Sequence, residues 1–419
     1  MQIQTGNKKT TGFFHSVGFM FVVYWGILVL WQNVSGAETR GTIDMLIKVG
    51  LLAYFAGFYL LRAKTLNAKA LLVAMLTISL LLTASTESQL QMSTVIAYVY
   101  PVLVLFLVYG LGDSMQISRS HLIAFCNCVI GITAYAAIYA VLFCWDQFAG
   151  ALSLTNAYGN ELSSFFISNH EYGMYLVASI ISVIVCLRLR PDVDKLSKGL
   201  YIAAMVLFFV NLILTFSRTS LLGLGVFLLI YCFFETPKSR KWIVAILVLG
   251  GIVLLVVPSL NEFVYKIVLK ENNSAGRDEL FEYALQYFKN GTVVEKVFGY
   301  GYAETRAHFV TSLDHGSVHN AYLQVLLYYG LVGCVSMVLF VLTQVITSIR
   351  FLRVDRFVGT VSLALVLCAA AMMVTNTAIL FTSPIDSFFL TMFFIWVPKY
   401  VRNCVRQNEF YRNSGDGSN

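Results

Sequence analysis

Runs of about 20 apolar residues, the length that crosses the hydrocarbon core of a bilayer, recur from Phe13 to Val401 with short polar interruptions. Lipid admits only helices or closed barrels, because every backbone polar group must be paired internally. A membrane barrel would show short segments of alternating polarity, and this sequence has none. The pattern therefore predicts an all-α polytopic membrane protein.

Twelve segments have the length and apolarity of membrane-spanning helices. They cover residues 13–32, 44–61, 66–83, 92–110, 121–145, 170–189, 199–216, 219–234, 242–258, 321–347, 358–379 and 385–401. The cysteines fall inside these spans or on the terminal tail, so the sequence suggests neither a disulfide framework nor a zinc site.

The composition agrees with this class, since 58% of the 419 residues are hydrophobic and only 12% are charged, against about a quarter in soluble domains. The net charge of +7 does not point to nucleic acid, because its excess lies in the short connections of one side. Basic residues crowd the connections 62–69, 188–198, 238–241 and 350–356 and both chain ends, whereas the short loops opposite hold Arg40 and Arg218. The positive-inside rule then places both termini in the cytoplasm.

The predicted spans divide the chain into four parts. Residues 1–258 hold helices one to nine, 259–320 form a long extracytoplasmic loop, 321–401 hold the last three helices, and 402–419 form a cytoplasmic tail. The first span follows two lysines and precedes a small-residue stretch, which imitates a signal peptide. We interpret it as an uncleaved anchor, because the apolar run is long and further spans follow.

The long loop is the main departure from a simple bundle, since loops of this length are usually functional or disordered. Its stretch GRDELFEYALQYFKN repeats apolar residues at helical intervals, with acidic residues near the start and Lys289 near the end. We predict an amphipathic helix there, lying over the outer face of the bundle. The second outer segment, Asp146 to Asn169, is shorter and polar.

Arg218 is the first candidate functional residue, in the stretch LTFSRTS between two predicted spans with almost no loop. One interpretation is an interfacial arginine whose guanidinium reaches lipid phosphates. The other is a functional cation. This arginine lies on the side whose short loops otherwise hold few basic residues, and hydroxyl side chains are its neighbours.

Arg277 is the second candidate, because Gly276-Arg277 opens the predicted loop helix. Exposed backbone N–H groups at a helix start and a guanidinium both suit an anion such as phosphate. Residues 259–320 carry six Lys and Arg against eight Asp and Glu, so an anion would bind through placed arginines rather than a basic surface. The alternative is a solvated arginine beside Asp278.

The third group of candidate residues lies at the end of the long loop, in the stretch VFGYGYAETRAHFVTSLDHGSVHNAYL. Gly299 and Gly301 predict a tight turn, because no strand–glycine–helix unit surrounds them to form a phosphate loop. His315 and His319 have a spacing that suits a metal ion, yet no third or fourth ligand is evident. His319 is either a structural residue at a helix start or a general base, since imidazole accepts a proton near neutral pH.

In this order, the motifs resemble those of one protein family. Ser217-Arg218 follows an apolar helix, Gly276-Arg277 opens a helix in a long outer loop, and FGYG and HNAYLQVLLYYGLVG complete the series. FISNHEYGMYL is similar to the asparagine-containing start of an earlier helix. Over about residues 166–333 the chain resembles the O-antigen polymerase and O-antigen ligase family of bacterial surface polysaccharide enzymes.

The resemblance implies an integral-membrane glycosyltransferase of the GT-C type that works without nucleotide sugar, metal or other cofactor. Its substrates would be glycans linked to undecaprenyl diphosphate at the outer face of the inner (cytoplasmic) membrane. Membrane lipid, a chain-length regulator and a flippase would be its other partners. Two departures loosen any subfamily assignment: Thr219-Ser220 replaces a small-residue pair, and Phe281 stands where tryptophan is common.

The resemblance also implies roles for individual residues. Arg218 and Arg277 match phosphate-handling arginines, and His319 matches a loop-end histidine. Our hypothesis is that His319 takes the proton of the acceptor hydroxyl or orients that hydroxyl. The further candidates for substrate contact are Asn320, Arg306, Asn169, His170 and His315.

Polymerisation of repeat units is the favoured reaction, because most members of the family join such units, and ligation to a lipid A core is the alternative. A flippase or transporter would show internal repeats, interrupted helices and ionisable groups near the bilayer centre, features that are scarce here. A purely structural scaffold would leave the histidine-bearing loop unexplained.

Overall fold

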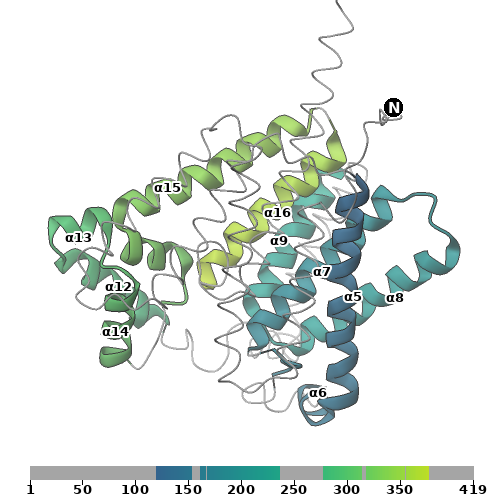
Figure 1. Cartoon of the computed structure of the whole chain (residues 1–419), viewed down its shortest axis with the longest axis horizontal. Helices are drawn as coiled ribbons and strands as arrows, with labels where there is room; N and C mark the ends of the chain where they lie inside the picture. The colour runs from purple at the N-terminus through teal and green to yellow at the C-terminus, as the bar shows by residue number, and fades with distance from the viewer. Residues whose placement is uncertain are drawn as a thin grey trace, which may run out of the picture.

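The computed structural model describes residues 119–152, 161–166, 168–235, 277–313, 318–353 and 355–376. All regular elements within these ranges are α-helices (Figure 1). Six of them are long and apolar enough to cross a membrane. They are α5 (Arg119–Phe143), α7 (Asn169–Leu189), α8 (Lys195–Leu214), α9 (Arg218–Glu235), α15 (Ala321–Phe351) and α16 (Arg356–Thr375).

These helices agree with the predicted all-α polytopic class. Six of the predicted spans coincide with them, and α8 begins at Lys195 rather than at 199 because Asp194 caps it, accepting a hydrogen bond from the Ser197 backbone N–H at 3.0 Å. The other six predicted spans, 13–32, 44–61, 66–83, 92–110, 242–258 and 385–401, lie outside the described residues. The total of twelve spans and the GT-C architecture remain predictions.

Side-chain caps fix where the spans begin. Ser168 accepts a hydrogen bond from the Glu171 N–H at the start of α7, and Asp355 accepts one from the Val358 N–H at the start of α16. Each such cap contributes about 1 kcal/mol, because it pairs a backbone donor that the first helical turn leaves unsatisfied.

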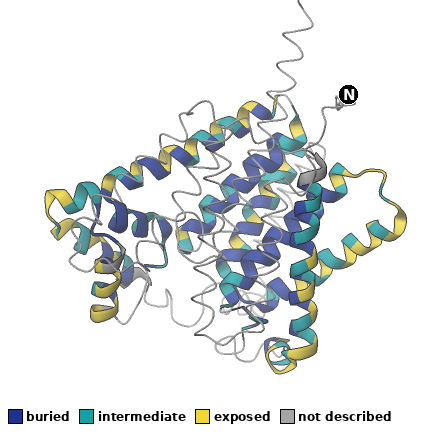
Figure 2. Ribbon diagram, in the orientation of Figure 1, coloured by how far each residue is buried: buried dark blue, intermediate teal, exposed yellow. Residues whose placement is uncertain are grey.

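The centre of the bundle is formed by α7 and α16. In α7, 78% of the most apolar stretch is buried, and in α16 72%, against 17% in α8. Figure 2 shows this contrast, with buried residues along α7 and α16 and exposed ones along α8. α16 packs against both α9 and α15, and α5 packs against α7. The face that α8 leaves exposed is apolar, as expected for a helix in contact with lipid.

Two of the basic connections, 188–198 and 350–356, lie at one end of this bundle. Arg356 Nε donates a hydrogen bond to the Phe234 carbonyl oxygen at 2.6 Å, so α16 begins where α9 ends. The Arg188 guanidinium lies 5.7 Å from the centroid of the Phe357 ring, which places the end of α7 there too. For these two connections, the charge bias of the sequence thus corresponds to one end of the bundle. That this end faces the cytoplasm remains a prediction.

Four shorter helices lie towards the opposite end. α6 (Trp145–Leu152) follows α5, and α12 (Arg277–Asn290), α13 (Val293–Phe298) and α14 (Tyr302–Leu313) group together beside α15 (Figure 1). The amphipathic helix predicted in the long loop is confirmed as α12, which contacts α15. The sequence did not predict α13 and α14, so the described part of the loop is a small helical module rather than a single helix.

An aromatic stack holds the module of α12, α13 and α14 together. The Tyr287 ring stacks on Tyr300 at 4.2 Å and on His308 at 4.1 Å between centroids. Tyr283 Oη lies 2.8 Å from His308 Nε2, and Tyr300 Oη donates to the Tyr287 carbonyl oxygen at 2.8 Å. Burial, reinforced by Glu295 and Glu304, raises the pKa of Tyr300 to about 12, so this phenol keeps its proton and remains a donor.

The module attaches to α15 by direct backbone contact at a kink. Gly330 interrupts α15 with φ 64° and ψ −163°. Its Cα faces Gly299, whose φ of 92° belongs, with the 85° of Gly301, to the tight turn predicted for this pair. The Tyr300 N–H donates to the Leu327 carbonyl oxygen at 2.7 Å. This bond pairs a carbonyl near the kink, so the turn helps to set the direction of the first part of α15.

Candidate functional site

The turn between α8 and α9 presents Arg218 as the first residue of α9. Phe216 in this turn has φ 49°, which is unusual for a bulky residue. Thr215 Oγ1 accepts a hydrogen bond from the Ser217 N–H at 3.2 Å and stabilises the turn. Arg218 is half-buried, its Nη2 atom is shielded from solvent, and the positive end of the α9 dipole adds to its charge. The turn between α8 and α9 therefore favours the binding of an anion.

The start of α7 is hydrogen-bonded to the same turn. Asn169 Nδ2 donates to the Thr215 carbonyl oxygen at 2.9 Å. His170 Nδ1 lies 3.1 Å from Ser217 Oγ, which is 2.9 Å from Ser220 Oγ. Two predicted site residues, Asn169 and His170, are thus brought directly beside Arg218.

Gly173 lets α7 and α9 approach closely enough for these bonds. A Cβ at this position would lie 2.5 Å from Ser220 Oγ and 3.0 Å from Ser217 Cβ. Any larger residue would push the two helices apart, and with them the His170–Ser217 contact.

The end of α16 lies at the same place. Thr219 Oγ1, one residue beyond Arg218, is 2.8 Å from Thr375 Oγ1 at the last turn of α16. Asn376 Nδ2 approaches Met174 Sδ of α7 at 3.9 Å. The starts of α7 and α9 therefore meet the end of α16.

The start of α15 is tied to this end of α16 as well. Tyr322 Oη donates to the Ala370 carbonyl oxygen at 3.0 Å, and Ala370 lies about 7.5 Å from Thr375 along the helix axis. Asn320 caps α15 by accepting a hydrogen bond from the Leu323 N–H at 3.0 Å. His319 precedes this cap with φ 52°, outside the regions that most residues adopt. Asn320, rather than His319, is the structural cap.

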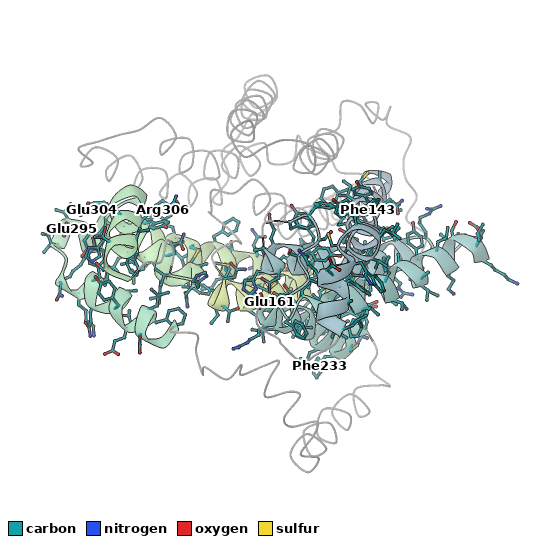
Figure 3. All side chains as sticks on the ribbon, turned by 90° about the horizontal axis from the view of Figure 1, so that it is seen from below. Phe143, Glu161, Phe233, Glu295, Glu304 and Arg306 are labelled. Atoms are coloured by element: carbon teal, nitrogen blue, oxygen red, sulfur yellow. The ribbon has the colours of Figure 1, made fainter. Side chains whose placement is uncertain are left out.

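The hydrogen bonds described above do not place Arg277, Arg306 or His315 at this cluster, and they place His319 there only through the start of α15. Arg277 is the first residue of α12, whose Leu280 and Ala284 are buried, but its side chain lies outside the described part of the chain. Arg306 is exposed on α14, and Figure 3 places it with Glu295 and Glu304 in the helical module. His315 falls outside the described residues.

Two features of the site were missed by the sequence analysis. Ser217 was named only as a neighbouring hydroxyl, although it links His170 to the Arg218 turn. Gln324, one turn into α15, was not named at all, although it is the only amide between Asn320 and Gln344. An amide in a mostly apolar membrane-spanning run is the signal that could have found it.

The His, Cys, Asp and Glu side chains are the possible metal ligands of the site. Among the described residues, no three or more His, Cys, Asp or Glu side chains come together as a metal site would require. The chemistry that this part of the chain offers is a guanidinium, several hydroxyls and two imidazoles.

Comparison with known families adds one finding. Residues 203–338 match the family model described as O-antigen ligase. The match covers 136 of the 419 residues. The match confirms the resemblance to O-antigen polymerases and ligases, and it supports a membrane glycosyltransferase activity of that broad type. No protein among the curated sequences matches the chain.

The O-antigen ligase region runs from α8 into α15, so it contains Arg218, Arg277, Arg306, His319 and Asn320. Asn169 and His170 precede it on α7, yet they bond to Thr215 and Ser217 inside it. The family region and the start of α7 therefore form one site.

Proposed function

We propose that the protein polymerises undecaprenyl-diphosphate-linked oligosaccharide repeat units into O-antigen, capsular or exopolysaccharide. The reaction takes place at the outer face of the inner (cytoplasmic) membrane, with both termini in the cytoplasm. The observation that carries the proposal is the meeting of three helix starts, those of α7, α9 and α15, with the end of α16. Arg218 and His319 stand on two of these starts, inside the matched family region.

The donor enters as a glycan on a lipid diphosphate. As the bond between its anomeric carbon and the diphosphate oxygen breaks, negative charge grows on the diphosphate. Arg218 stabilises this charge more strongly than an exposed arginine would, because it is half-buried in a turn held by hydrogen bonds from α7. Arg277, at the start of α12, provides the second guanidinium.

The acceptor hydroxyl must lose its proton as its oxygen bonds to the anomeric carbon. His319 accepts this proton, and the diphosphate carries away the electron pair of the broken bond. The positive φ of His319 supports this role, because unusual backbone conformations are retained where the surrounding structure holds a functional side chain in place. Asn320 fixes the helix start behind it.

The remaining candidates serve binding rather than proton transfer. Asn169 and His170 hold the Arg218 turn through Thr215 and Ser217. Arg306 and His315 come from the helical module and the segment after it, and we assign them to the glycan. A chain-length regulator and a flippase are the proposed partners.

Ligation to a lipid A core is the second candidate, because the matching family is described as O-antigen ligase. Both reactions use the same donor and leaving group, so they differ only in the acceptor.

The surface polysaccharide of a deletion strain distinguishes these functions. For a polymerase we expect loss of long chains while single repeat units stay attached, because ligation is intact. For a ligase all attached glycan would be absent. An unchanged polysaccharide pattern would contradict both functions, and re-expression of the wild-type chain is the control.

A further inference from the structure

Gln324 is a buried polar side chain on the first part of α15. It is 8% exposed, and its Oε1 atom has no hydrogen-bond partner in the part of the chain that the structure describes. An unsatisfied buried acceptor destabilises a fold, because it has lost its hydrogen bonds to water and gained none in the protein. Such an atom inside a membrane-spanning helix marks a place where a ligand is expected to supply the missing donor.

The position of Gln324 directs its amide towards the candidate site. The Gln324 N–H donates to the Asn320 carbonyl oxygen at 2.9 Å, so the two residues are one turn apart on the same face of α15. Side chains on a helix lean towards its N-terminus and cover the preceding turn. The amide of Gln324 therefore extends over the turn that begins with Asn320 and follows His319.

The chemistry of Gln324 Oε1 restricts which groups it can bind. A carbonyl oxygen accepts hydrogen bonds, so it repels phosphate and pairs with an O–H or N–H donor. In the proposed reaction, the groups close to His319 are the acceptor hydroxyl and the neighbouring substituents of the same sugar. A hydroxyl or an acetamido N–H on that sugar fits the acceptor atom.

We propose that Gln324 is a specificity-determining residue. Its Oε1 atom accepts a hydrogen bond from one hydroxyl or amide N–H of the acceptor sugar beside His319. This assignment rests on the proposed glycosyl transfer and deepens it. Arg218 and His319 carry the reaction, while Gln324 selects and orients the sugar whose hydroxyl attacks.

The assignment predicts an unusual combination of effects for Gln324→Met. Methionine fills a similar volume without an unsatisfied acceptor, so the melting temperature should stay the same or rise. The purified full-length variant is assayed with lipid-diphosphate-linked repeat units and a panel of acceptors that each lack one hydroxyl or acetamido group. Wild type should lose about tenfold in kcat/KM with one of these analogues. The variant should accept that analogue and the complete acceptor within about twofold of each other, while it still discriminates at every other position.

The control is Gln344→Met, a buried glutamine further along the same helix, which should keep the wild-type discrimination. The assignment is overturned if Gln324→Met discriminates among all analogues as wild type does, or if its melting temperature falls as for a residue whose bonds are satisfied. Wild-type protein that elongates no acceptor at all would instead overturn the proposed function, and the role of Gln324 with it.

Discussion

Replacing His319 with asparagine is expected to leave the protein folded and to lower the rate of chain elongation by about 10²–10⁴-fold, the usual contribution of general acid–base catalysis. Asparagine tolerates the left-handed backbone conformation better than most residues, and His319 has φ 52°. The variant therefore keeps the turn before Asn320 and removes only the imidazole. Elongation is measured with purified protein and lipid-diphosphate-linked repeat units.

A His319→Gly variant completes this comparison, because glycine adopts a positive φ without strain. If His319 serves only to shape the turn, both variants should elongate chains at close to the wild-type rate. That result, in proteins that melt at the wild-type temperature, would remove His319 from the reaction.

Replacing Gly330 with alanine should destabilise the protein by more than about 3 kcal/mol, because it combines two unfavourable effects. Alanine would be strained at φ 64°, and its Cβ would overlap the carbonyl oxygen of Val297 and come within 2.5 Å of the Gly299 nitrogen. These atoms belong to backbone, which cannot move aside as a side chain can. The helical module would lose its contact with α15, so we expect low expression in membranes and a lowered melting temperature.

Gly131→Ala is the matched control for this effect. Gly131 lies in α5, and a Cβ there would meet no atom within 4 Å. Alanine favours a helix over glycine by about 1 kcal/mol, so this variant should be as stable as wild type or slightly more so. Equal stability of the Gly330 and Gly131 variants would contradict the assignment of the kink as a fixed contact.

The sequence predicts the local structure well where one short segment determines it. Apolar runs predict the spans. The amphipathic spacing after Arg277 predicts α12, and Gly299 and Gly301 predict a turn. The kink at Gly330 could not be predicted in this way, because its conformation depends on a turn that approaches from another part of the chain.

In the candidate site, too, the sequence indicates individual residues but not the long-range contacts around them. Arg218 and His319 were proposed from their residue types and their places at helix starts. Their surroundings depend on long-range contacts: Ser217 meets His170 across 47 residues, and Thr219 meets Thr375 across 156. No pattern in a single sequence records such pairs. The burial of Gln324 and its unpaired oxygen likewise come only from the structure.

The central claim is that the end of the bundle bearing Arg218 and His319 faces the extracytoplasmic side, where lipid-linked repeat units are elongated. Labelling of single cysteines by a membrane-impermeant maleimide in spheroplasts tests it most directly. The two positions are the exposed acids Glu282, on α12, and Asp192, in the basic connection between α7 and α8. With the eight native cysteines replaced, Glu282→Cys should be labelled in intact spheroplasts and Asp192→Cys only after lysis. The reverse pattern would place the candidate site in the cytoplasm and contradict the account.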